Sequence, residues 1–324
     1  MSSLPLLRIL LVNWNSGDQL RACLRSVAQV ARHDTFRFEQ VVVVDNASSD
    51  GSADDPETTF ASGPAAIPLR VLRNETNRGF AAACNQGAEG SEADYLLLLN
   101  PDTVAYPDSF DAPIAFLERP ENRRIGILGI RLLDENGQVS RRCARFPTPR
   151  LLIGRSFGAD VLLPSRFPSQ FMKEWDHEDS REVDQVMGAY FLVRRQVWEE
   201  IGGMDERFFV YFEDVDFALR AKRAGWVSYY WNGASIFHKG GGTTERVKAV
   251  RLAYSLFGRI QYARKHFSPW GATGVLLAVL LGDSATRLGR ALLRRSPAEA
   301  AETLRAFVLL ARGLRRGTIL PGKG

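Results

Sequence analysis

Two short acidic motifs combine residue types and spacing that suit metal-assisted chemistry. Asn100-Pro101-Asp102 follows four leucines, so Asp102 is predicted to stand where a buried strand reaches the surface. Mg²⁺ is typically held by one or two carboxylates together with substrate phosphates, and Mn²⁺ also accepts imidazole. His238, between an apolar run and a glycine-rich turn, is therefore the second candidate metal ligand. Taken alone, the tripeptide is more typical of a turn or a helix N-cap, and a lone histidine after a strand is more often structural.

The second acidic motif is Glu213-Asp214-Val215-Asp216, directly after the aromatic stretch Phe208–Phe212. Acids at a helix N-terminus are stabilised by ~0.3–1 kcal/mol, which accounts for such a cluster without any chemistry. A carboxylate against an aromatic wall is also expected to have a raised pKa, as a general base near neutral pH requires. We predict that Asp214 is the base and that Glu213 or Asp216 orients an acceptor or a loop.

Polar residues also follow four expected strands in succession. In parallel sheets, ligands bind outside the carboxyl ends of the strands. Asn, Asp and Gly are common turn residues, but four such loops in a row favour one binding site. The loops are Asn13 and Asn15 after Leu7–Val12, Asp45 after Val41–Val44, Asn77-Arg78-Gly79 after Leu69–Leu72, and Asn100 after Tyr95–Leu99.

The elements that must position these residues alternate in the first half of the chain. Uninterrupted Val and Leu strands separated by helices predict an α/β fold with a mostly parallel sheet covered on both faces. The second half changes character, and residues 145–182 are predicted to be a long variable loop region that shapes the acceptor site. The other expected elements are a hairpin of Ile125–Leu133 and Gln138–Ala144, strands Val183–Val193 (containing Gly188) and Val227–Trp231, and a helix over 245–267.

Composition excludes several protein classes. The 324 residues carry a net charge of +5, but residues 268–324 hold nine basic and three acidic residues, so positions 1–267 are close to neutral. This partition argues against a nucleic-acid partner and favours a local basic surface. The three separated cysteines suit a reducing cytosol rather than a disulfide framework. We expect no signal peptide, and the longest apolar run, Val275–Leu281, is too short to span a bilayer.

The basic tail is predicted to form two amphipathic helices. Leu277, Leu281, Leu288 and Leu292 recur at helical spacing among arginines, and Ser296-Pro297-Ala298-Glu299 starts a second helix. A basic amphipathic pair suits peripheral contact with a membrane surface. An oligomer interface or a helical cap over the catalytic domain explains the pattern equally well.

Five motifs in order carry a family resemblance. They are Val12-Asn13-Trp14-Asn15, the segment Val43–Ser52, the segment Asn74–Phe80, Asn100-Pro101-Asp102 and the segment Phe212–Asp216. Over about residues 6–245 the chain resembles family 2 glycosyltransferases of the GT-A fold, and within that family the bacterial rhamnosyltransferases that use dTDP-L-rhamnose. The resemblance implies inverting, metal-dependent transfer from a nucleotide-diphosphate sugar to a glycan, or to a lipid-linked glycan if the tail contacts a membrane, in cell-surface polysaccharide synthesis. In such a transfer we expect the metal and Arg78 to offset the charge that accumulates on the departing diphosphate. One departure is Asn100, where the metal-binding motif usually begins with an acid.

The resemblance also implies roles and boundaries. Asp102 would be the metal-binding acid, His238 a further metal or diphosphate ligand, and Asp214 the base; the metal would be Mg²⁺ or Mn²⁺. A catalytic domain over 1–244, with halves at 1–120 and 121–244, would precede a helical region over 245–324. The cell location would be cytoplasmic, peripheral on the membrane. The donor site is expected to contain Asn13, Asn15, Asp45, Asn77, Arg78, Gly79, Asn100 and Asp102, and the acceptor side Gly188, Glu213 and Asp216.

Four rival functions remain open at the level of sequence. A UDP-hexose-dependent transferase differs only in its donor. A nucleotidyltransferase would need a basic, glycine-rich N-terminal loop, and Asn13–Gly17 has no Lys or Arg. A processive synthase would need membrane spans and a Gln-x-x-Arg-Trp motif, of which Gln261–Lys265 is only a partial match. An inactive nucleotide-sugar-binding scaffold would not need Asp102, Asp214 and His238 together.

Overall fold

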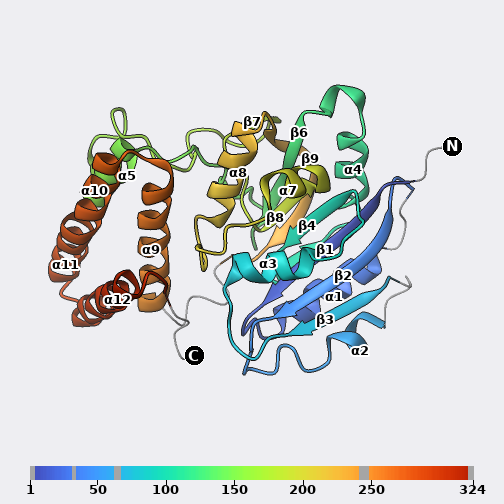
Figure 1. The fold of residues 1–324 in the computed structure, drawn as a ribbon, viewed down its shortest axis with the longest axis horizontal. Helices are drawn as coiled ribbons and strands as arrows, with labels where there is room; N and C mark the ends of the chain where they lie inside the picture. The colour runs from blue at the N-terminus through green and yellow to red at the C-terminus, as the bar shows by residue number, and fades with distance from the viewer. Residues whose placement is uncertain (1–3, 31–33, 62–66, 241–247, 320–324) are drawn as a thin grey trace.

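The computed structural model describes residues 4–30, 34–61, 67–240 and 248–319. In this part of the chain one mixed sheet, in the order β3-β2-β1-β4-β8-β6-β9-β5 with β7 paired to β9, is flanked by helices (Figure 1). The predicted α/β class with a central sheet and C-terminal helices is confirmed. The strands are β1 Leu6–Asn13, β2 Arg37–Asp45, β3 Leu69–Arg73, β4 Tyr95–Leu99, β5 Thr103–Ala105, β6 Ile125–Leu133, β7 Arg181–Val183, β8 Tyr190–Arg194 and β9 Val227–His238.

The first four strands form the parallel part of the sheet. β1 pairs in parallel with β2 and β4, and β2 pairs in parallel with β3. Alternate residues of these strands face opposite sides, where α1 (Gln19–Gln29) covers one face and α3 (Phe80–Ala88) the other. The register places Asn13 opposite Asp45, so the polar loops after these strands meet at one edge, as the sequence predicts.

The second half of the sheet is mixed rather than mostly parallel. β8 runs antiparallel to β4 and β6, whereas β9 is parallel to β6 and antiparallel to β5 and β7. The other helices around the sheet are α2 Pro56–Ala61, α4 Asp111–Leu117, η1 Pro120–Asn122, α5 Pro149–Ser156, α6 Ala159–Leu162, α7 Arg195–Ile201 and α8 Glu213–Arg223.

Four predicted elements differ from the structure. The turn at Asp134 forms, but the strand predicted over 138–144 is reduced to isolated bridges, because Ala144 exchanges backbone hydrogen bonds with Gln185. The same exchange pulls residues 184–189 out of the sheet, so the strand predicted over 183–193 is split into β7 and β8. Residues 145–182, predicted as loop, contain α5 and α6. The strand predicted to end at Trp231 continues to His238.

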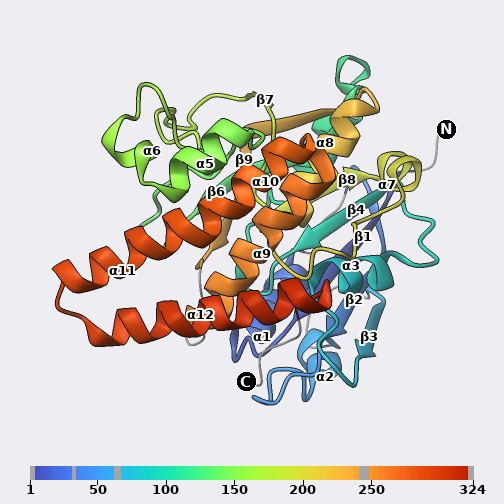
Figure 2. The ribbon, with the colours of Figure 1, turned by 60° about the vertical axis from the view of Figure 1, so that its left-hand side comes forward.

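The C-terminal helices pack on one another around their own apolar cluster. They are α9 Lys248–His266, α10 Pro269–Leu277, the π-helical segment η3 Ala278–Asp283, α11 Ser284–Leu293 and α12 Pro297–Arg316. Ser296 caps α12 by accepting a hydrogen bond from the Glu299 amide at 3.3 Å, as the sequence predicts. α10, η3 and α11 follow one another without a break, and α12 turns back from the end of α11 to pack on α9 (Figure 2). The predicted domain boundary at residue 244 lies outside the described residues.

Candidate active site

A pocket of about 270 Å³ lies at the carboxyl ends of the parallel strands. It brings together five of the residues that the sequence singled out, from three separate segments. The predicted site residues that line it are Asn77, Gly79, Asn100, Asp102 and His238. Other lining residues, which were not among the predicted site residues, include Trp14, Asn46, Met187, Tyr211, Arg251 and Tyr254.

Asp102 and His238 meet because β5 and β9 are paired at this edge. Thr103 lies opposite His238 in the register, and the Lys239 amide donates to the Asp102 carbonyl at 3.0 Å. The His238 Nε2 atom is 3.4 Å from Asp102 Oδ1. That carboxylate oxygen is buried and accepts no hydrogen bond within the described part of the chain. A carboxylate oxygen without a donor beside an imidazole nitrogen is a donor set that fits a divalent cation.

The protein alone supplies an incomplete metal site. Among the described residues no group of three or more His, Cys, Asp or Glu side chains is placed to share an ion. Two protein ligands leave most coordination positions to water or substrate oxygens, which is the ordinary arrangement for Mg²⁺ at phosphate-binding sites.

Asn13, Asn15 and Asp45 fix loops and do not line the pocket. The Asn13 amide is fully buried and donates to Asp45 Oδ1 at 2.8 Å, and also to the hydroxyls of Ser48 and Ser52. The Asn15 side chain accepts from the Ser49 amide at 2.8 Å. These side chains therefore hold the loops after β1 and β2 together. The neighbouring Asn46 reaches the pocket instead.

The backbone of the 77–80 loop is fixed against Phe209, and Arg78 does not line the pocket. Gly79 has φ +87°, and a Cβ there would lie 2.5 Å from the Phe209 carbonyl, to which the Phe80 amide donates at 2.6 Å. Arg78 lines a separate hollow beside α3, so the prediction that it offsets diphosphate charge in this pocket is not supported.

The cation that lines the pocket is Arg251, on the first turn of α9. It makes no ion pair with a described residue. The helix over 245–267 was predicted from its apolar positions. The sequence does not indicate which way a basic residue at the start of a helix is directed, so Arg251 was not predicted as a site residue.

Asp214 stands at the N-terminus of α8 with a partly exposed carboxylate. Its oxygens accept from Gln185 Nε2 at 2.7 Å and from the Val215 amide at 2.8 Å, and the Gly188 amide also bonds to it. Burial raises the pKa of Asp214, and these hydrogen bonds only partly offset that rise. A Cβ on Gly188 would lie 3.3 Å from Asp214 Oδ2, so a glycine allows this close approach.

The two acids beside Asp214 have different environments. Glu213 is 6% exposed and its Oε2 is buried without a partner in the described chain. Burial and then the charges of Asp214 and Asp216 raise the pKa of Glu213 well above its usual value.

Asp216, like Asp214, does not line the pocket. Burial acts to raise its pKa, but His266, Lys265 and Arg220 outweigh burial and lower it. Its carboxylate bonds to Arg220 Nε at 2.8 Å and to His266 Nε2 at 2.7 Å. Asp216 therefore ties α8 to the end of α9.

The segment 187–189 connects the two acidic motifs. Met187 lines the pocket of Asp102, Gly188 contacts Asp214, and the Ala189 carbonyl accepts from the Asn100 amide at 3.0 Å. Tyr211 and Phe212, which precede the acids of α8, both adopt left-handed φ values of 70° and 73°. Two consecutive non-glycine residues in this region are strained, and such strain is concentrated at functional sites.

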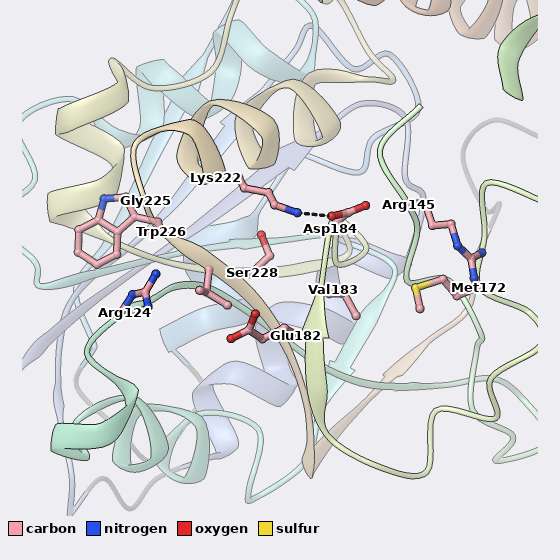
Figure 3. Close-up of a pocket in the computed structure, with 11 residues that line it drawn as sticks. Arg124, Arg145, Met172, Glu182, Val183, Asp184, Lys222, Gly225, Trp226 and Ser228 are labelled. Atoms are coloured by element: carbon pink, nitrogen blue, oxygen red, sulfur yellow. Dashed lines mark hydrogen bonds and ion pairs between the residues drawn. The ribbon is translucent and has the colours of Figure 1, made fainter. Parts of the chain in front are cut away.

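A second, larger hollow of about 650 Å³ lies between β7, β9 and the end of α8 (Figure 3). Lys222 pairs with Asp184 there at 2.7 Å, and Arg124, Arg145 and Glu182 also contribute charge. None of the residues that line it was a predicted site residue, and none lines the Asp102 pocket. The link between this hollow and Asp214 is a covalent one: Asp184 lines the hollow, and the next residue, Gln185, donates to Asp214.

Comparisons with known proteins agree with this geometry. Residues 5–259 match the family described as "Glycosyltransferase like family 2". The chain is 30% identical, over 90% of its length and 95% of the relative, to N-acetylglucosaminyl-diphospho-decaprenol L-rhamnosyltransferase of Mycobacterium tuberculosis. It is 25% identical to the low-salt glycan biosynthesis hexosyltransferase Agl10 of Haloferax volcanii, over 67% of this chain and 62% of that protein.

A solved structure supports the fold. A mannosyltransferase from Pyrobaculum calidifontis, in complex with GDP-Man and Mn²⁺, superposes with a TM-score of 0.54 at 18% identity, over 97% of this chain and 81% of that one. The fold, with an aspartate at the end of β4, is that of the GT-A glycosyltransferases. The chain belongs to glycosyltransferase family 2.

Proposed function

We propose that this glycosyltransferase moves L-rhamnose from dTDP-L-rhamnose to a lipid-linked glycan, with inversion at the anomeric carbon, in bacterial cell-surface polysaccharide synthesis. The observation that carries the proposal is the Asp102–His238 pair, 3.4 Å apart in a pocket lined by Met187, whose chain neighbour Gly188 contacts Asp214. The choice of sugar and acceptor is supported by the mycobacterial relative, whose name specifies an L-rhamnosyl group and a diphospho-decaprenol acceptor.

Asp102 and His238 would hold a divalent cation, Mg²⁺ or Mn²⁺. The donor set fits either ion, and the archaeal mannosyltransferase of the same fold was solved with Mn²⁺. When bound, the cation supplies charge compensation for a leaving diphosphate.

The other chemical roles belong to side chains of this chain. Asp214 takes the proton of an acceptor hydroxyl, and the oxygen of that hydroxyl forms a bond to the anomeric carbon of the donor. The bond from that carbon to the diphosphate oxygen breaks, and the nucleoside diphosphate leaves with the electron pair. Gln185 and the Gly188 amide hold the Asp214 carboxylate, so it does not reorient during transfer.

Arg251 takes the electrostatic role that the sequence assigned to Arg78. Arg251 lines the pocket that contains Asp102, whereas Arg78 lines the hollow beside α3. A fixed cation aimed at developing negative charge favours the transition state over the ground state.

Replacing the base tests the proposal. Asp214→Asn keeps the size of the side chain and removes its basicity, so we expect donor binding within about twofold of wild type. The transfer rate should fall by about 10²–10⁴-fold, the usual contribution of a general base. Donor binding is measured by calorimetry and transfer by product formation. Asp55→Asn, at an exposed site, is the matched control and should transfer at the wild-type rate. Near wild-type turnover by Asp214→Asn would remove Asp214 from the role of base.

The same assay decides between the proposed donor and its alternative. The archaeal relative is named a hexosyltransferase, which supports a UDP-hexose donor as the second candidate. A screen of dTDP-rhamnose and UDP-hexoses, with and without Mn²⁺, should favour dTDP-rhamnose. Preference for a UDP-hexose would overturn the donor assignment, and donor binding without product from any acceptor would favour a binding scaffold.

A further inference from the structure

Exposed large apolar side chains are concentrated in two segments of the described chain. Apart from Leu4, they all fall within residues 157–163 and 270–308. Val161 and Leu162 of α6 are 78% and 76% exposed, and Leu293 of α11 is 87% exposed. Apolar side chains gathered in this way mark an interaction surface. The set is Phe157, Val161, Leu162, Leu163, Trp270, Leu277, Leu280, Leu281, Leu292, Leu293, Leu304 and Val308.

The two segments are fixed to each other by packing at Gly282. A Cβ on Gly282 would lie 3.0 Å from the Ser156 carbonyl and 3.1 Å from the Phe157 ring, so η3 rests directly on the end of α5. Thr286 Oγ1 donates to the same Ser156 carbonyl at 3.2 Å. The exposed side chains of residues 157–163 therefore begin where η3 touches α5, next to Leu280 and Leu281.

A buried ion pair fastens this contact to the rest of the molecule. Asp283 Oδ2 accepts from Ser156 Oγ at 2.6 Å and from Arg259 of α9 at 2.7 Å. Arg259 is 2% exposed and Asp283 is 5% exposed. Because α5, η3 and α9 share one desolvated polar cluster, the apolar surface is a rigid part of the fold rather than a loose tail.

The charge around these apolar side chains is strongly positive. The described segments 148–167 and 268–319 contain eleven arginines and four acids. Three of the acids are paired: Asp283 with Arg259, Glu299 with Arg294, and Glu302 with Arg305. The free charge of the surface is therefore cationic, which is complementary to anionic lipid headgroups.

We propose that residues 157–163 and the α10–η3–α11 rod form one surface that docks on an anionic membrane. The leucines and Val161 enter the boundary between headgroups and acyl chains, and the arginines face lipid phosphates. Figure 2 shows the rod running outward from α9 with α5 and α6 on one side of it. The sequence assigned membrane contact to 268–324 alone and assigned 145–182 to the acceptor; in this proposal α6 is part of the docking surface.

A bilayer suits this surface better than a second copy of the chain. In a two-fold symmetric dimer the same patch faces itself, so arginines would meet arginines across the interface. A membrane rich in phosphatidylglycerol offers both an apolar layer and negative charge. The proposal goes beyond the proposed function, because it concerns location and its test needs no transfer activity.

Vesicle sedimentation of the full-length protein tests the proposal. The wild type should bind vesicles of phosphatidylcholine mixed with phosphatidylglycerol, and bind pure phosphatidylcholine more weakly by about tenfold. The double variants Val161→Glu with Leu162→Glu, and Leu292→Glu with Leu293→Glu, should each lower binding by about tenfold or more. Leu4→Glu, at the exposed apolar residue outside the surface, is the matched control and should bind like wild type.

Each other outcome overturns part or all of the proposal. Equal vesicle binding by the wild type and all variants would contradict the proposed docking surface. Loss of binding in the Leu292 and Leu293 variant alone would remove α6 from it and leave the tail as the anchor. A stable dimer in analytical ultracentrifugation that the Val161 and Leu162 variant abolishes, without vesicle binding, would assign the surface to a second copy. Unchanged melting temperatures exclude misfolding, since the substituted side chains are exposed.

Discussion

At Asp214, burial and hydrogen bonding act on the same carboxylate in opposite directions. Burial raises its pKa, while donors from Gln185, Val215 and Gly188 favour the ionised form and restrain that rise. A carboxylate whose pKa is raised in this way is more basic than an exposed aspartate. Its protonation is then expected to limit transfer on the acidic side of the pH profile.

Removing the Gln185 donor should shift the acidic limb of the pH profile, which is the pH range over which kcat/KM falls as Asp214 becomes protonated. Gln185→Leu deletes a hydrogen bond to the charged form, so the pKa of Asp214 rises further and the fall in kcat/KM occurs at a higher pH than in wild type. A role limited to packing would lower the rate without moving the limb. The measurement is kcat/KM against pH, with exposed Gln196→Leu as the control. A limb at the wild-type position in Gln185→Leu would contradict the assignment of Asp214 as the titrating base.

Residue types at strand ends allowed part of the site to be predicted. Asp102 and His238 could be named together as metal ligands from their residue types and the family resemblance, but the pairing of β5 with β9 that brings them together was not predicted. The direction of Arg78 could not be predicted, because it depends on the backbone of Gly79 against Phe209. Arg251 was missed for the same kind of reason: its place depends on how α9 docks.

At the scale of elements, long apolar runs determined what could be foreseen. The parallel strands are buried on both faces and therefore read as unbroken Val and Leu runs. The strands predicted over 138–144 and 183–193 fail because a long-range exchange between Ala144 and Gln185 competes with local pairing. Such an exchange joins residues 41 positions apart in the sequence, and no local pattern reports it.

Helix α9 packs closely against the strained loop Tyr211-Phe212 that precedes α8, and a single substitution can test this contact. Gly258 of α9 rests on the Tyr211 carbonyl, and a Cβ there would lie 2.6 Å from that oxygen. Gly258→Ala should therefore destabilise the fold by about 1–3 kcal/mol and lower the transfer rate, because the loop that carries Asp214 must shift.

Gly289→Ala is the matched control for that helix substitution. Nothing lies within 4 Å of a Cβ at Gly289 of α11, so alanine there should stabilise its helix by up to about 1 kcal/mol and leave transfer unchanged. Denaturant midpoints and transfer rates of the two variants give the comparison. Equal stability of both variants would contradict a tight contact between α9 and the loop.

At the scale of the whole molecule, the sheet and the C-terminal helices share the catalytic pocket. The sheet contributes Asp102 and His238, and α9 contributes Arg251 and Tyr254 to the same cavity. Among the described residues no helix is long and apolar enough to cross a membrane. The net charge of +5 is concentrated in residues 268–324, whose helices carry most of the exposed apolar side chains, whereas α9, which completes the pocket, precedes that segment.

The most direct test of the central claim is transfer from dTDP-L-rhamnose to a lipid-linked glycan, measured before and after addition of excess chelator. If Asp102 and His238 hold a divalent cation that assists departure of the diphosphate, chelation should abolish product formation. Adding Mn²⁺ or Mg²⁺ back should restore it, with inverted anomeric configuration in the product. Full activity in excess chelator would contradict the metal role of Asp102 and His238.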